Sequence, residues 1–139
     1  MVIVAAVDGS DRATEIVQEA DKLARRFETE LHVVHVLNET TFLDLERSNV
    51  SKKGRALGMD EIRTKAKDIA SDAASHVTND FDAVGLVGNV VTQINTYAET
   101  HDAAFIVIGS RRRSPVGKVL AGSVTQRVLL SAEIPVVVV

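Results

Sequence analysis

The sequence predicts an α/β fold, an open five-stranded, mainly parallel sheet with helices on both faces. Short apolar runs rich in valine and isoleucine alternate strictly with segments whose apolar residues recur at helical spacing, and this alternation indicates parallel strands joined by helical crossovers. The chain has 139 residues, of which 45% are apolar, so we expect one domain over 1–139 with its own core. Glycine, serine, aspartate and asparagine follow the predicted strands, at the edge where such folds bind ligands.

Five segments are predicted to be buried strands because they are short, continuous and apolar and end at turn-forming residues. The expected strands are 2–7, 31–37, 83–87, 104–108 and 134–139.

Four segments have the three- and four-residue apolar spacing of amphipathic helices, and Ser10 or Asp11 is suited to cap the first of them. The expected helices are 13–27, 59–77, 91–98 and 123–130. Between the second strand and the second helix, the segment 38–58 is polar and has no clear period. We expect this segment to be an excursion over the site rather than a separate domain.

The composition excludes several classes of function. The net charge is −3, which gives no general attraction to nucleic acid or anionic membranes. Cysteine is absent, which removes disulfides, thiolate metal sites and thiol nucleophiles. No apolar run approaches the roughly 20 residues of a membrane span, and the N-terminus has no basic leader. We therefore expect a cytoplasmic protein.

Common catalytic and nucleotide-binding motifs do not fit. In a P-loop aligned on Gly117 and Lys118, Arg112 would stand at the first glycine and Val119 at the hydroxyl position. G-x-G-x-x-G, G-x-S-x-G and H-E-x-x-H do not occur. His35 is better explained as a hydrogen-bonded core or rim histidine than as a metal ligand.

The segment 109–126, GSRRRSPVGKVLAGSVTQ, has the composition of a phosphate-binding loop. Gly109 ends a predicted strand, and Gly122 and Ser123 begin a predicted helix, whose N-terminus offers unpaired N–H groups and the positive end of its dipole. Glycine lets an anion approach the backbone, and the arginines 111–113 add positive charge. The alternative is a solvated basic loop followed by an ordinary helix-capping serine.

These features together resemble the nucleotide-binding branch of the universal stress protein family over the whole chain. The family's G-x-x-G, nine residues, G-[ST] signature is similar to Gly109-Ser110-Arg111-Arg112, nine residues, Gly122-Ser123-Val124. The N-terminal VIVAAVDGSDRATEIVQEA, the C-terminal GSVTQRVLLSAEIPVVVV and the strand containing His35-Val36 are similar to family sequences too.

The resemblance implies binding of ATP, with Mg²⁺ as a candidate ion bound together with the nucleotide, and a regulatory or stress-response role. Asp8 would lie beside the ribose and the adenine edge, as a ligand to sugar or Mg²⁺ rather than a catalyst. Val36 would line the adenine pocket, with Ala6 and Ile108 as further candidates. The glycine-rich segment would wrap the ribose and the phosphates. The expected binding residues are Asp8, Ser10, Val36, Ile108, Gly109, Arg111, Arg112, Gly122, Ser123 and Val124.

One residue departs from the signature, because Arg112 replaces its second glycine. An arginine costs roughly 1–2 kcal/mol if the position needs positive φ, but its guanidinium could also chelate phosphate oxygens. Two functions therefore stay open: a nucleotide-dependent regulatory protein with at most slow ATP hydrolysis, and a dimeric interaction module with a degenerate site. Nucleic-acid binding through 111–113 is disfavoured by the acidic net charge and the lack of exposed aromatic platforms nearby.

The last predicted strand, 134–139, is expected at a sheet edge. An edge strand presents unpaired N–H and C=O groups, and this one carries four valines. We expect a homodimer in which two copies pair these strands around a two-fold axis.

Overall fold

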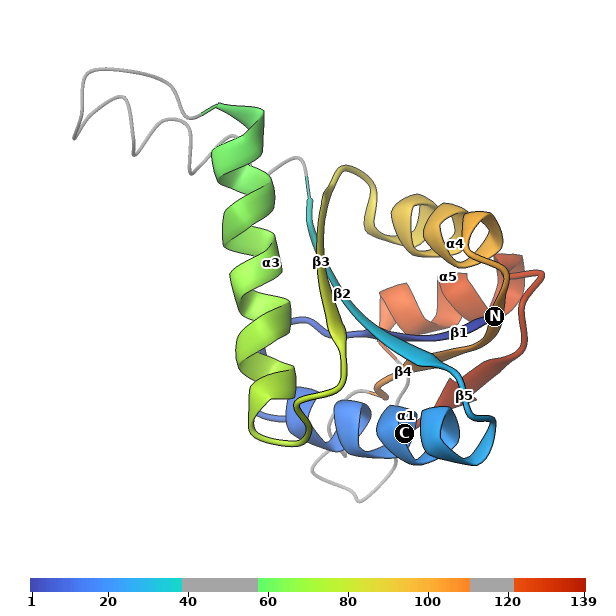
Figure 1. Cartoon of the computed structure of the whole chain (residues 1–139). Coiled ribbons are helices and arrows are strands. Elements are labelled where there is room, and N and C mark those ends of the chain that lie inside the picture. The colour runs from blue at the N-terminus through green and yellow to red at the C-terminus, as the bar shows by residue number, and fades with distance from the viewer. Residues whose placement is uncertain (39–57, 111–121) are drawn as a thin grey trace, which may run out of the picture.

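The computed structural model describes residues 1–38, 58–110 and 122–139, and within them the chain forms a five-stranded sheet flanked by helices (Figure 1). The strand order is β3-β2-β1-β4-β5, and all neighbouring strands are parallel. The predicted fold class is confirmed. The elements are β1 (Val2–Ala6), α1 (Ala13–Arg26), β2 (Glu30–Leu37), α3 (Met59–Ser75), β3 (Asp82–Val87), α4 (Val90–Thr100), β4 (Ala103–Ile108), α5 (Ser123–Ser131) and β5 (Val136–Val138).

Two apolar layers cover the two faces of the sheet. Successive side chains of a strand point to opposite faces, so Ile3 and Ala5 of β1 pack with α1 and α3, whereas Val2 and Val4 pack with α4 and α5. Figure 1 shows α1 and α3 on one side of the strands and α4 and α5 on the other. All five residues of β1 are buried, which explains why its sequence is continuously apolar rather than alternating.

The strand order reverses beside β1. From β1 the chain builds outward through β2 to β3, then returns to place β4 on the other side of β1 and β5 beyond it. The crossovers that leave β1 and β4 therefore run toward different parts of the sheet, and this divergence creates the crevice in which folds of this type bind ligands.

Several expected boundaries are corrected. Neither Ser10 nor Asp11 is the N-cap of α1, because the helix begins at Ala13 and Arg12 holds the N-cap position without a side-chain capping bond. The Ser10 hydroxyl instead accepts a hydrogen bond from the Arg12 N–H at 3.3 Å. β5 is shorter than the expected 134–139, although the backbone of Pro135 and Val139 still bonds to β4. Most of the expected excursion, 39–57, lies outside the described residues. No helix in the described ranges is long and apolar enough to cross a membrane.

Helix α3 lies directly on β3 at Gly85. A Cβ added to Gly85 would be 2.1 Å from the carbonyl oxygen of Arg63 and 2.5 Å from the backbone nitrogen of Lys67. Both contacts are with backbone, which cannot rotate away as a side chain could. The close approach of α3 to the sheet therefore requires glycine at this position.

We expect Gly85→Ala to lower the free energy of unfolding by about 3 kcal/mol, because the methyl group must displace the whole helix. Urea denaturation followed by circular dichroism measures this change. Gly58→Ser is the control, since nothing lies within 4 Å of a Cβ there and serine is a favoured N-cap residue for α3. Equal stability of Gly85→Ala and the unchanged chain would contradict this packing.

Candidate functional site

A pocket of about 800 Å³ opens at the carboxyl end of the sheet, between the ends of β1, β2 and β4 and the start of α5. Its volume falls within the range of small-molecule and cofactor sites. One part of its wall is apolar, with side chains that include Ala6, Val34, Val36, Val90, Ile94 and Ile108. The polar part includes Asp8, Ser10, Arg12, His35, Asn38, Ser110 and Thr125.

The pocket brings together most of the residues expected from the sequence. Asp8, Ser10, Val36, Ile108, Gly109 and Val124 line it, and so does Ala6. Gly122 and Ser123 directly precede Val124 at the start of α5. Arg111 and Arg112 lie outside the described residues.

The turn after β1 fixes the Asp8 carboxylate at the pocket. Gly9 has a φ of 80°, a conformation that residues with a side chain rarely adopt, and this bend lets the Ser10 N–H donate to Asp8 Oδ1 at 2.9 Å. Partial burial opposes ionisation of Asp8. The pKa of Asp8 is nevertheless lowered, because favourable interactions with the charged form outweigh burial. These interactions are hydrogen bonds from the hydroxyl and N–H of Ser10 and from the N–H of Asp8 itself, and attraction from His35. A charged acceptor therefore lines the pocket at neutral pH.

His35 is a buried histidine at the floor of the pocket, as the sequence indicated. Its Nδ1 lies 2.7 Å from the carbonyl oxygen of Val7. Because a carbonyl only accepts, Nδ1 carries the proton and donates. This bond ties β2 to the end of β1 and fixes the orientation of the imidazole ring.

The start of α5 presents backbone donors beside the pocket. Gly122 is the N-cap residue, with extended backbone and no side chain that could cap the helix. The N–H groups in the first turn of a helix have no intrahelical partner and carry the positive end of the dipole. Since Val124 and Thr125 line the pocket, this end of α5 offers an anion-binding surface.

Sequence reasoning missed several pocket residues, among them Thr125 and Arg12. Thr125, in the first turn of α5, donates its hydroxyl to the Gly109 carbonyl at 2.6 Å and so ties the helix to the end of β4. Arg12 donates to the Ser110 carbonyl at 3.4 Å and pairs with Glu15 at 3.2 Å. One signal could have revealed Arg12: a cation at a helix N-terminus is unfavourable to the dipole, so a basic N-cap residue suggests a role other than helix stability.

Gly109 lies where the end of β4 passes close to α1. An added Cβ would lie 2.7 Å from Ile16 Cδ1 of α1, so the end of the isoleucine side chain would have to move aside. The lack of a side chain also leaves the pocket open at this point.

An all-parallel sheet with a pocket at the reversal of its strand order is typical of α/β proteins that bind small ligands. The chain belongs to the universal stress protein family, because the model of that family matches residues 1–139. The resemblance to this family that was noted from the sequence is therefore confirmed.

Solved and curated relatives support the same assignment. A universal stress protein of Methanocaldococcus jannaschii is 28% identical over 141 residues, which cover 99% of this chain and 80% of the relative. The structure of a universal stress protein from Archaeoglobus fulgidus is 30% identical, with a TM-score of 0.64 and coverage of 99% and 97% of the two chains. A structure of the Archaeoglobus fulgidus universal stress protein in complex with dAMP is 26% identical, with a TM-score of 0.64 and coverage of 99% and 96%.

Substitution of Thr125 tests whether its hydroxyl holds α5 and β4 together at the pocket. We expect Thr125→Val to lower the free energy of unfolding by about 1–3 kcal/mol, because the Gly109 carbonyl loses the hydroxyl that donates to it. Thr125 is only 4% exposed, so water does not readily replace this hydrogen bond. Thermal and urea unfolding measure the loss. Thr125→Ser keeps the hydroxyl and is expected to lose less. If valine were tolerated better than serine, the hydrogen bond would not stabilise this junction.

Proposed function

We propose that this chain binds ATP in the pocket at the ends of β1 and β4, and that the bound nucleotide sets the regulatory state of a stress-response protein. The observation that carries the proposal is the combination, in one pocket, of an apolar wall, an ionised carboxylate and an uncapped helix N-terminus. These three surfaces match the three parts of a nucleotide: base, sugar and phosphates.

The adenine ring is assigned to the apolar wall. Val36 and Ile108 are 8% and 5% exposed, and Ala6 lies on the strand between theirs. These small side chains leave room for a flat ring at the pocket floor. Burial of an aromatic base there gains roughly 25 cal/mol for each Å² of apolar surface removed from water.

The ribose is assigned to Asp8. A carboxylate accepts hydrogen bonds only, and a ribose presents two adjacent hydroxyl donors. Ser10 holds the carboxylate in place through its N–H. The same carboxylate offers an oxygen ligand for the Mg²⁺ that accompanies ATP.

The phosphates are assigned to the start of α5. Gly122 allows close approach, Ser123 adds a hydroxyl, and Val124 and Thr125 continue the surface. Arg12 supplies a cation from α1 on the same pocket. Arg111 and Arg112 fall between Gly109 and Gly122 in the sequence and are proposed as further phosphate contacts.

The relative from Archaeoglobus fulgidus that is described in complex with dAMP supports an adenine nucleotide as the ligand class. The proposal extends this class to ATP because the pocket has an anion-binding end as well as an apolar end. No group in the described pocket is assigned as a catalyst of hydrolysis, since the one carboxylate is engaged by Ser10.

Asp8→Asn tests the ribose assignment. We expect adenosine and ATP to bind at least tenfold more weakly, because the amide loses one acceptor and its charge, and hydrogen bonds to charged groups are worth about 1.5–3 kcal/mol. Isothermal titration calorimetry gives the affinities. Asparagine retains an oxygen that can accept from Ser10, so the turn is kept.

Asp11→Asn is the matched control, because it removes the same charge three residues further on, from an exposed position outside the pocket lining. If both variants bound ATP as well as the unchanged chain, the site assignment would be wrong. If the unchanged chain bound neither adenosine nor ATP, the degenerate-site alternative raised by Arg112 would hold.

We propose in addition that the chain forms a homodimer through residues 134–139. β5 lies at the edge of the sheet and pairs with β4 on one side. Apolar side chains are exposed on β5 and on α5, where Val138 is 40% and Leu130 is 89% exposed. Pairing of two edge strands around a two-fold axis would satisfy the free edge and close the assembly.

Val138→Lys is expected to shift the protein from dimer to monomer, since a charge on the edge strand opposes pairing with a second copy. Sedimentation equilibrium compares the particle mass with the 15.0 kDa chain mass. Met59→Lys is the control, because Met59 is an apolar residue on α3 that is exposed to a similar degree, at 46%. This variant is expected to leave the dimer intact. A dimer that persisted in Val138→Lys would place the interface elsewhere.

A further inference from the structure

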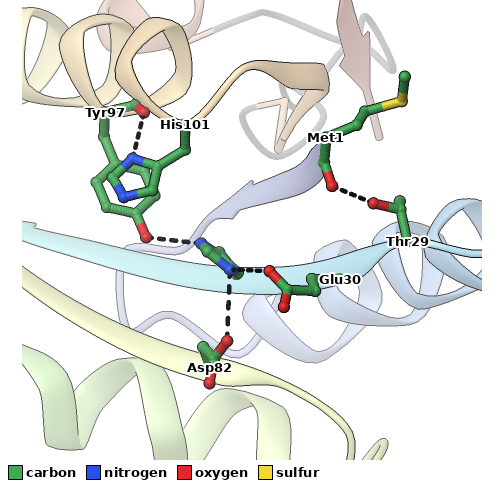
Figure 2. Close-up of polar contacts among 7 residues, drawn as sticks. Met1, Thr29, Glu30, Asp82, Tyr97 and His101 are labelled. Atoms are coloured by element: carbon green, nitrogen blue, oxygen red, sulfur yellow. Dashed lines mark hydrogen bonds and ion pairs between the residues drawn. The ribbon is translucent and has the colours of Figure 1, made fainter.

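A second group of polar side chains lies at the amino end of the sheet, at the opposite end of the strands from the pocket. Glu30 and Asp82 are the first residues of β2 and β3, and the parallel register places His32 directly beside Asp82. Figure 2 shows Glu30 and Asp82 pointing to the same ring nitrogen from β2 and β3, with Tyr97 of α4 and His101, the residue that follows this helix, above them. His32 is 8% exposed, whereas both carboxylates reach solvent.

The two carboxylates converge on one ring nitrogen. His32 Nε2 lies 3.2 Å from Glu30 Oε2 and 3.4 Å from Asp82 Oδ2, and the three ligand-type atoms all lie within 4.8 Å of one another. Two ligands that are each about 2.0–2.2 Å from a tetrahedral zinc ion are about 3.3–3.5 Å apart. The observed separations match this value. They exceed the roughly 2.7–2.9 Å of charge-assisted hydrogen bonds, and one N–H cannot point straight at two oxygens.

The other ring nitrogen of His32 is held as in a histidine that binds metal. Nδ1 lies 2.7 Å from the Tyr97 hydroxyl oxygen, which can accept a hydrogen bond from it. With the proton on Nδ1, the lone pair of Nε2 faces the carboxylates, and a metal ion between them makes that arrangement favourable. Hydrogen bonding of the remote nitrogen is the usual support of a metal-binding imidazole, because it fixes both tautomer and orientation.

Tyr97 is itself held in position. Its ring stacks on His101 with centroids 3.9 Å apart, and His101 Nδ1 donates to the Tyr97 carbonyl at 2.9 Å. The hydrogen-bond partner of His32 is therefore fixed in place before any ion arrives.

The surroundings also favour a cation. Glu30 borders a polar hollow of about 460 Å³ that includes Asp21, Glu28 and Asp80, with Arg25 paired to Asp21 at 2.8 Å. Acidic groups therefore outnumber basic ones in the lining of this hollow. Their summed potential attracts positive ions toward the exposed side of the His32 cluster.

We propose that Glu30, His32 and Asp82 form a binding site for a divalent transition-metal ion of the zinc type. Imidazole nitrogen with two carboxylates suits zinc, cobalt or nickel better than magnesium or calcium, which prefer oxygen ligands alone. The three protein ligands leave a fourth position for water. The bound ion joins the first residues of β2 and β3 and stabilises the folded chain in proportion to its occupancy.

The test titrates chelator-treated protein with Zn²⁺ by calorimetry and with Co²⁺ by visible absorption, in the absence of nucleotide. We expect one equivalent of either metal to bind and Zn²⁺ to raise the melting temperature. In long-range ¹H–¹⁵N spectra, Zn²⁺ is expected to shift Nε2 of His32. Mg²⁺ is expected to give none of these effects.

Variants assign the ligands. Glu30→Gln and Asp82→Asn change exposed side chains, so both are expected to fold, and each is expected to weaken Zn²⁺ binding at least tenfold. His76→Gln removes an exposed histidine outside the cluster and is expected to bind Zn²⁺ unchanged. The proposal is overturned if the two acidic variants retain full affinity, or if Zn²⁺ shifts only the other histidines. Either outcome leaves the nucleotide assignment untouched, because that site lies at the other end of the sheet.

Discussion

The burial of β1 between two strands and two layers of helices is the constraint on which the rest of the structure depends. A strand in this position has both faces and both edges covered, so every side chain from Val2 to Ala6 must be apolar and compact. The chain then leaves the sheet at Asp8, Gly9 and Ser10, which are the first polar residues after the strand. The contrast between the buried strand and this polar turn places a charged carboxylate at the edge of an apolar cavity.

Contacts between elements distant in sequence convert that cavity into a defined site. Thr125 joins α5 to the end of β4, His35 joins β2 to the end of β1, and Arg12 joins α1 to Ser110. Ser110 also donates, through its N–H at 2.9 Å and its hydroxyl at 3.0 Å, to the carbonyl of Val139. The pocket is therefore coupled through backbone to the C-terminal edge strand. If that edge pairs with a second copy, a nucleotide at the pocket and the dimer contact would influence each other through this short connection.

The sequence predicts the elements better than the contacts. The continuous apolar runs and the helical periods follow from burial alone, so the strands, the helices, the parallel order and the pocket-lining Asp8, Val36 and Gly109 could be anticipated. The N-cap of α1 could not be anticipated, because Ser10 forms a hydrogen bond with Asp8 in the turn and does not cap the helix. The cluster around His32 was also hidden, since Asp82 lies fifty residues along the chain and is brought beside it only by the β2–β3 register. Arg111 and Arg112 lie outside the described residues, so their role rests on the sequence pattern.

The central claim is that one pocket binds the base and the phosphates of an adenine nucleotide at its two ends. Backbone-amide NMR on the isotope-labelled chain, titrated in parallel with adenosine and with ATP, tests this claim directly. Adenosine is expected to shift amides at Asp8, Val36 and Ile108, and ATP is expected to shift these and, in addition, the amides of 122–125 at the start of α5. Identical shifts with the two ligands, or ATP-dependent shifts that avoid both groups, would contradict the account.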